Sequence, residues 1–232
     1  KHTFTSAFTR VNHLAHPDKN VQKYWIEWFK KFVDISVELG AVDMGSHLAI
    51  LSVFDNKDLN KRQEKLKEVV AGWHEIGKYA KEKGLEFLTW EPMSISREFG
   101  ETIEETIKID KILNTNSPLP IDLCLDVDHG DVSSKNSDDT NPYVWLEKLG
   151  GKSPIIHIKQ SSANKGGHWP FTKTYNDGGK IIPKKVFEAL EKSGAKEVDL
   201  LLELSFRERE PFESRVIQDI EESVRFWKEH LS

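Results

Sequence analysis

The sequence predicts an α/β fold of the TIM (β/α)8 barrel type, built from repeated strand–helix units. Short apolar runs alternate with long amphipathic segments along the 232 residues, and the units recur at roughly 30–40 residues, as in many α/β barrels. Repeated units of this kind imply parallel strands joined by right-handed crossovers. No GxGxxG motif follows the first strand, which weakens a nucleotide-binding interpretation. The pattern alone leaves either an open doubly wound sheet or most of an eight-stranded barrel.

Six apolar runs have the length of β-strands, and most of them are apolar nearly throughout. Strands that helices cover on both faces have this composition, because neither face meets water. The predicted strands are Thr3–Phe8, Val42–Ile50, Leu85–Trp90, Ile121–Val127, Pro154–Ile158 and Val198–Leu204.

Amphipathic helices fill the segments between these runs. Aromatic and aliphatic residues recur at helical spacing, and this stripe is best explained by packing against the sheet. Gly40 and Gly84 follow two of the segments as stop signals, and Pro142 and Pro183 stand at the starts of two others. The predicted helices are Tyr24–Leu39, Asn60–Lys83, Thr102–Leu113, Pro142–Leu149, Pro183–Ser193 and Phe212–Leu231. The longest segment that we expect to be irregular is Gln160–Gly179.

Composition narrows the function classes. The net charge is -5 and the sequence pI is about 6.0, which is unlike the basic surface of a nucleic-acid binder. The single cysteine, Cys124, excludes a disulfide within the chain and is consistent with a reducing compartment. No apolar stretch reaches the roughly 18–20 residues of a membrane span. We therefore expect a cytoplasmic protein with no nucleic-acid or membrane partner.

Polar residues that could bind a metal stand near the ends of four consecutive predicted strands. In a parallel α/β barrel the carboxyl ends of the strands carry the chemistry, so these residues could converge on one point. Carboxylates and an imidazole together suit Mn²⁺, Mg²⁺, Co²⁺ or Zn²⁺. The ligand candidates are Glu91, Asp126, His157 and Glu203; Asp128 and His129 follow Asp126, and Lys159 stands two positions after His157. The sequence thus predicts one divalent metal ion as the cofactor.

These motifs resemble the xylose isomerase-like superfamily of sugar and sugar phosphate isomerases and epimerases. The most specific parts are the run LDVDHG from Leu125 to Gly130 and the strand that carries His157 and Lys159. The superfamily includes tagatose and psicose epimerases, hydroxypyruvate isomerase, inosose dehydratase and, more distantly, endonuclease IV. The resemblance covers the whole chain and implies one TIM-barrel domain over residues 1–232. It aligns Thr3–Phe8 with the third barrel strand, so the first two strand–helix units would be missing.

The resemblance also implies roles for the residues. Glu91, Asp126, His157 and Glu203 would ligate one divalent metal, and Glu91 and Glu203 would be the catalytic pair that transfers a proton. The metal would polarise a carbonyl and stabilise an enediolate, so that the reaction is isomerisation or epimerisation of a small sugar or sugar phosphate. Candidate substrate-binding residues are His129, Arg207, His47, Lys159, His168, His13 and Trp90, with Trp169 as a second apolar wall.

Other functions stay open at this point. A keto-polyol dehydratase would use the same kind of site, and an endonuclease IV-like phosphodiesterase would need two further metals. Gln160–Gly179 lacks the Asp-x-His pair of that nuclease, and it also lacks the acidic residue and the arginine of epimerases that act on free ketohexoses. A non-catalytic sugar-binding barrel is the alternative outside enzymes. The expected partner is a small carbohydrate, and homo-oligomers are common among such barrels.

Overall fold

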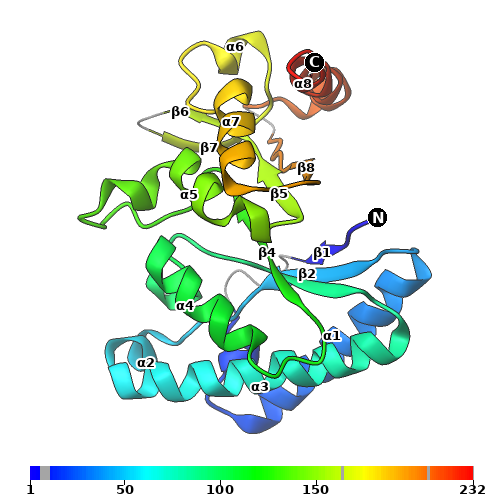
Figure 1. Ribbon diagram of the computed structural model, residues 1–232, viewed down its shortest axis with the longest axis vertical. Coiled ribbons are helices and arrows are strands. Elements are labelled where there is room, and N and C mark those ends of the chain that lie inside the picture. Colours follow the sequence, from blue (N-terminus) through cyan, green and yellow to red (C-terminus); the bar gives the residue numbers. More distant parts are fainter. Residues whose placement is uncertain (6–10, 163–164, 208–209, 232) are drawn as a thin grey trace. The chain divides into compact units, whose positions relative to one another are not determined.

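The computed structural model describes residues 1–5, 11–162, 165–207 and 210–231. The chain divides into two compact units, which are described here one at a time (Figure 1). Unit 1 comprises Lys1–Cys124 with Gly130–Asp139, and unit 2 comprises Leu125–His129 with Thr140–Ser232. Strand β4 (Ile121–Asp126) passes from unit 1 into unit 2. The prediction of one domain over residues 1–232 stays a prediction.

The sheet of unit 1 is parallel. It contains β1 (Phe4–Thr5), β2 (Asp43–His47), β3 (Phe87–Glu91) and the start of β4, in that order. Gly45 lies opposite both Phe4 and Thr89, and a Cβ at this position would overlap the two side chains. The glycine therefore allows the three strands to approach one another. At the carboxyl ends of β2 and β3, His47 and Glu91 lie opposite each other in the strand register.

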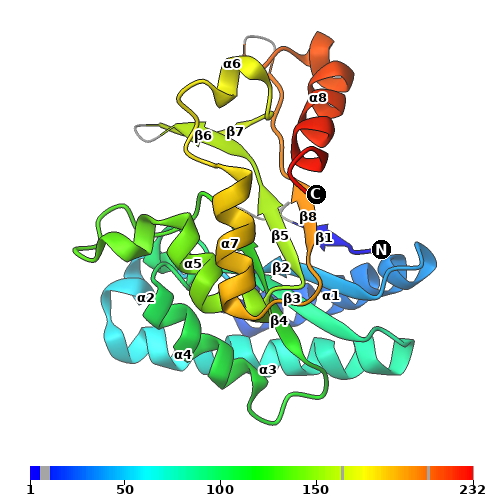
Figure 2. The ribbon, with the colours of Figure 1, turned by 45° about the horizontal axis from the view of Figure 1, so that its top comes forward.

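Helices of unit 1 pack beside one another along this sheet. They are α1 (Lys19–Glu38), α2 (Val53–Lys57), α3 (Leu59–Lys83) and α4 (Ile103–Asn114), and α1 and α3 lie side by side (Figures 1 and 2). Phe29 of α1 and Trp73 of α3 are buried at that contact, with ring centroids 6.4 Å apart. The Asp58 side chain caps α3, and Gly84 ends it with φ 94°.

Unit 2 joins a short parallel pair to an antiparallel hairpin. Strand β5 (Ile155–Ile158) pairs with β8 (Asp199–Leu202), and β6 (Gln160–Ser162) pairs with β7 (Lys165–Trp169). The helices are α5 (Pro142–Leu149), α6 (Lys173–Asn176), α7 (Pro183–Ser193) and α8 (Val216–Lys228). Helices α5 and α7 pack against each other, each beginning with the proline expected at its start (Figure 2).

The observed elements follow the predicted ones closely, with informative differences. Helix α1 begins at Lys19, before the predicted Tyr24, because the Asp18 carboxylate accepts a hydrogen bond from the Asn20 N–H and caps it. Helix α8 begins later than predicted, since a 3₁₀ turn at Glu213–Arg215 precedes it. The predicted first strand is described only at Phe4–Thr5, and residues 6–8 lie outside the described residues.

The expectation of an irregular segment at Gln160–Gly179 is wrong. The described residues of that segment form the β6–β7 hairpin and α6. Its glycines and polar residues give little strand signal on their own, so tertiary contacts decide the conformation. Of the helices in the described part of the chain, none has both the length and the apolar composition to cross a bilayer.

A buried acid between α1 and α3 gives the first prediction. Burial alone would raise the pKa of Glu68, but hydrogen bonds from Lys19, Lys65 and Gln22 outweigh it and lower the pKa to about 2, below the ordinary 4.5. Ionised Glu68 therefore stabilises the fold fully above pH 4.5, and this contribution is lost as the pH falls from 4.5 towards 2. Glu68→Gln should lower the free energy of unfolding at pH 7 by about 1–2 kcal/mol.

The measurement is urea unfolding of wild type and variant at several pH values from 7 down to 3. The difference between the two proteins should shrink as the pH falls through 4.5. Glu64→Gln is the matched control, because Glu64 lies on the same helix with its side chain 56% exposed and forms a surface ion pair with Lys61. A pH-independent difference for Glu68→Gln would contradict the assignment.

Candidate metal centre and substrate pocket

Three metal-ligand candidates lie together in unit 2. Asp126 is the last residue of β4, His157 belongs to β5, and Glu203 directly follows β8. One ligand-type atom from each lies within 4.8 Å of the other two. The Val127 N–H donates to the His157 carbonyl at 3.2 Å, and the Glu203 N–H donates to the Ile158 carbonyl at 3.0 Å. Backbone hydrogen bonds between neighbouring chain segments thus set the spacing of the three side chains.

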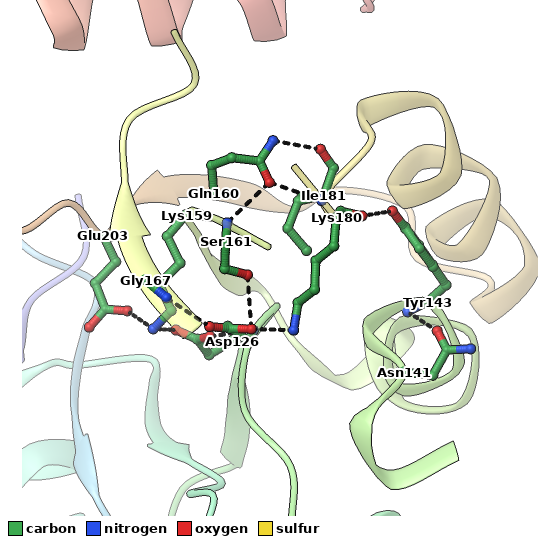
Figure 3. A network of polar contacts seen from close by, with 11 residues as sticks. Asp126, Asn141, Tyr143, Lys159, Gln160, Ser161, Gly167, Lys180, Ile181 and Glu203 are labelled. Atoms are coloured by element: carbon green, nitrogen blue, oxygen red, sulfur yellow. Dashed lines mark hydrogen bonds and ion pairs between the residues drawn. The ribbon is translucent and has the colours of Figure 1, made fainter. Parts of the chain in front are cut away.

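A buried lysine neutralises two members of this cluster. The Lys159 Nζ lies 2.7 Å from Asp126 Oδ2 and 2.7 Å from Glu203 Oε2, and the residue is only 1% exposed (Figure 3). Burial by itself would lower the pKa of the ammonium, but the charges of Asp126 and Glu203 outweigh it and raise the pKa. Lys159 therefore stays protonated at neutral pH and balances carboxylates whose mutual repulsion would otherwise be large.

The remaining contacts orient the carboxylates. The Asp128 N–H donates to Asp126 Oδ1 at 2.7 Å, so both oxygens of Asp126 face positive or donor groups. The Nδ1 atom of His168 lies 3.4 Å from Glu203 Oε2, and hydrogen bonding to Glu203 is the main cause that raises the pKa of His168. Glu203 is the more accessible of the two acids, with its side chain 34% exposed. Of the two carboxylates paired with Lys159, it is the one that a substrate can reach more easily.

The fourth ligand candidate, Glu91, ends β3 in unit 1. Its Oε2 lies 3.2 Å from Nε2 of His47 across the β2–β3 register, and both side chains are buried. His13 is also fully buried, where its ring meets Trp25 and Phe29 edge-on. Burial, with a smaller contribution from the charge of His47, lowers the pKa of His13 to about 3. His13 is therefore neutral at physiological pH.

A polar pocket of about 360 Å³ adjoins the cluster in unit 2. Lys159 and His168 belong both to its lining and to the contacts of Glu203. The pocket brings together four of the predicted substrate-binding residues. The residues of its wall that matter here are Asp128, His129, Lys159, His168, Trp169 and Arg207.

An acid with no role assigned by the sequence motif anchors the wall of this pocket. Asp128 Oδ1 accepts a hydrogen bond from the Ser161 hydroxyl at 3.0 Å and forms an ion pair with Lys180. Its Oδ2 lies 3.4 Å from the Gly167 nitrogen. Asp128 thus ties both strands of the β6–β7 hairpin to the end of β4. Its position two residues after Asp126 was the only signal in the sequence, since its partners are distant along the chain.

The other predicted contacts remain predictions. His47 and His13 lie in unit 1, and Trp90 is fully buried there. Because side chains alternate along a strand, Trp90 occupies the opposite face of β3 from Glu91, and its ring contacts the Gly100 region. Strand geometry therefore does not favour Trp90 as a sugar wall. Trp169 does line the pocket and stacks on Tyr175 with centroids 5.4 Å apart.

The donor set suits a divalent cation. Carboxylate and imidazole ligands are those of Mn²⁺, Zn²⁺ and related ions, and the cluster already holds a positive charge on Lys159 against two carboxylates. Asp126, His157 and Glu203 would hold the ion from unit 2.

Parallel strands alternating with helices, and carboxylate and imidazole groups gathered at the strand ends, define an α/β protein with a candidate metal site. The chain belongs to the xylose isomerase-like TIM-barrel family, whose profile matches residues 2–230. This confirms the α/β barrel class predicted from the sequence and excludes the open doubly wound sheet.

Particular relatives are sugar epimerases and isomerases. The chain is 45% identical over 228 residues to D-erythrulose 1-phosphate 3-epimerase of Brucella abortus (strain 2308), covering 98% of this chain and 74% of the relative. A putative xylose isomerase from Rhodospirillum rubrum has a similar structure, with a TM-score of 0.86 at 21% identity over 98% of this chain and 76% of its own. The structure of the IOLI protein with a bound zinc atom is also similar, with a TM-score of 0.66 at 17% identity over 99% of this chain and 76% of its own.

The buried lysine gives a prediction for the metal-free protein. Lys159→Met keeps most of the side-chain volume but removes the charge, leaving the buried carboxylate of Asp126 near the partly exposed one of Glu203. The free energy of unfolding should fall by about 2–4 kcal/mol, somewhat less than for a fully buried ion pair that loses one partner, because water screens Glu203. Urea unfolding in the presence of a chelator measures this loss, and added Mn²⁺ should raise the melting temperature more in the variant than in wild type.

Lys184→Met is the matched control, because Lys184 is exposed on α7 and lies 3.9 Å from Glu188. That change should move the stability by less than about 0.5 kcal/mol. Equal stability of Lys159→Met and wild type would show that the ion pairs of Lys159 with Asp126 and Glu203 contribute nothing to folding.

Proposed function

We propose that this chain is the catalytic part of a divalent-metal-dependent epimerase that inverts C3 of a small ketose 1-phosphate. The observation that carries the proposal is the cluster of Asp126, His157 and Glu203 in a chain with 45% identity to D-erythrulose 1-phosphate 3-epimerase. A ketotetrose phosphate is accordingly the first substrate to test. The wider class, sugar isomerase or epimerase, agrees with the family of the chain.

In this proposal Glu91 completes the ligand set of Asp126, His157 and Glu203. The assignment rests on its place at the end of β3 and on the sequence motif. When bound, the ion supplies positive charge beside the ketone oxygen, which gains negative charge as the C3 proton leaves. Because Lys159 lies between Asp126 and Glu203, its ammonium orients both carboxylates through ion pairs.

Glu203 and Glu91 are the proposed proton-transfer pair. One carboxylate removes the proton from C3, and the other returns a proton to the same carbon from the opposite face, which inverts its configuration. The partly exposed Glu203 side chain is suited to meet the substrate, and the His168 Nδ1 contact limits its rotation. His47, held 3.2 Å from Glu91, is the corresponding orienting group in unit 1.

The alternatives differ in their products. Return of the proton to the neighbouring carbon gives aldose–ketose isomerisation, and loss of a hydroxyl gives dehydration. Both would use the same residues, so product analysis separates them. We favour epimerisation because of the relative's activity.

Metal content is the first test of the site. Wild-type protein should hold about one equivalent of Mn, Co, Zn or Mg by elemental analysis, and His157→Ala should hold less than about a tenth of that. His230→Ala is the control, since His230 is exposed at the end of α8. Two or three equivalents in wild type would favour phosphodiester hydrolysis. No metal after reconstitution would contradict the enzyme assignment.

Proton transfer is tested with D-erythrulose 1-phosphate in D₂O, followed by NMR at C3. Wild type should interconvert the two C3 epimers with solvent deuterium incorporated at that carbon. Glu203→Gln and Glu91→Gln should each lower kcat for epimerisation at least about 100-fold, because each removes one of the two proton-transfer groups. If both variants keep their metal, the carboxylate that remains in each can exchange the C3 proton on one face only. Each variant should therefore incorporate deuterium into a different epimer.

Glu188→Gln on the exposed face of α7 is the control for the charge change and should turn over normally. Normal turnover by Glu203→Gln would refute the proposed mechanism. Formation of an aldose phosphate, or of a dehydrated product, would replace epimerisation with the corresponding alternative.

A further inference from the structure

The pocket beside the cluster has chemistry that the proton transfer does not use. Lys159 and His168 line this pocket and also contact Glu203. The pocket continues along β7 and the segment after β8. The Ser205 N–H donates to the His168 carbonyl at 2.9 Å, which fixes these two walls to each other. A group bound here would lie next to a substrate held at Glu203.

Arg207 is the cation of this pocket that is available to an anion. The Lys159 ammonium forms ion pairs with Asp126 and Glu203. The Lys180 ammonium forms an ion pair with Asp128. Within the residues that the structure describes, the Arg207 guanidinium has no ion pair, and the residue is exposed. Its backbone is nevertheless held, because its N–H donates to the Pro211 carbonyl at 2.9 Å.

The opposite wall is shaped by glycine. Gly166 and Gly167 line the pocket, and a Cβ on Gly167 would lie 2.6 Å from the Trp169 ring. The Trp169 ring therefore packs directly on the Gly167 backbone, and Asp128 holds that backbone in place through the Gly167 N–H. This wall of the pocket is thus fixed by contacts within unit 2.

One carboxylate at the pocket works against an anion. Glu210 lines it, and its Oε1 is 3.4 Å from the Tyr175 hydroxyl. Burial, followed by the charge of Glu210, raises the pKa of Tyr175 to about 12, so the phenol remains a donor to this carboxylate. The carboxylate of Glu210 repels an anion in this pocket, so anion binding needs a cation that outweighs the repulsion. The guanidinium of Arg207 is always charged and can donate two parallel hydrogen bonds to one anion.

We propose that this pocket is the subsite for the phosphate monoester of the substrate, with Arg207 as its charged ligand and the Ser205 hydroxyl as a neutral one. The inference rests on the proposed function for its substrate class. Phosphate on C1 would be held by Arg207 while C3 lies at Glu203. The subsite would therefore set the preference for a phosphorylated over a free ketose.

The test compares wild type, Arg207→Ala and Arg207→Lys, with Arg225→Ala as the control because Arg225 lies on α8 away from this pocket. The substrates are D-erythrulose 1-phosphate and free D-erythrulose. Arg207→Ala should raise KM for the phosphorylated ketose about 10–100-fold, the loss expected for charge-assisted hydrogen bonds. The metal content should stay that of wild type, and the preference in kcat/KM for the phosphorylated over the free ketose should fall about 10–100-fold. Arg207→Lys should recover part of the affinity.

A second readout does not need turnover. Inorganic phosphate should raise the melting temperature of metal-loaded wild type and Arg225→Ala, but not of Arg207→Ala. If Arg207→Ala binds phosphate and the phosphorylated ketose as wild type does, the subsite is wrong although the epimerase assignment stands. If wild type turns over neither ketose but phosphate still stabilises it through Arg207, the subsite stands and the proposed function fails.

Discussion

The buried charge balance around Lys159 is the interaction on which the rest of the centre depends. Asp126 ends β4 and Glu203 follows β8, with β5 between these two strands in the sheet, and the carboxylates of a buried and a partly exposed acid lie on either side of the Lys159 ammonium. Negative charges so close together repel each other, and a nearby cation reduces that repulsion. The ammonium of Lys159 is this cation, and a divalent ion suits the same carboxylates. The charge of Lys159 therefore stabilises the packing of these strand ends.

A second layer of contacts turns these strand ends into a site with walls. Asp128 uses both carboxylate oxygens to hold Ser161, Lys180 and Gly167, and the Gln160 amide hydrogen-bonds both backbone groups of Ile181 (Figure 3). The hairpin that bears His168 and Trp169 is thereby attached to β4 and to the segment before α7. Positioning of the pocket thus depends on residues that touch neither metal nor substrate.

Much of this organisation was predictable because the physics is local. A strand covered on both faces must be apolar, so a carboxylate at its end stands out, and this pattern identifies Glu91, Asp126 and Glu203. Caps and prolines likewise set the bounds of α5 and α7. The β6–β7 hairpin escaped prediction because its short strands contain glycine and polar residues, and Asp128 stabilises it from a distant part of the chain. No local pattern contains that contact.

By itself the sequence determined the order of strands and helices and the kinds of residue at the strand ends, since both follow from periodicity and from what a buried strand tolerates. Only the tertiary structure decided which charges meet. It paired Lys159 with Asp126 and Glu203, gave Asp128 its partners, and left Arg207 without an ion pair among the described residues. The physical reason is that hydrogen bonds and ion pairs act over a few ångströms, and residues more than 40 positions apart reach that distance only after the chain has folded.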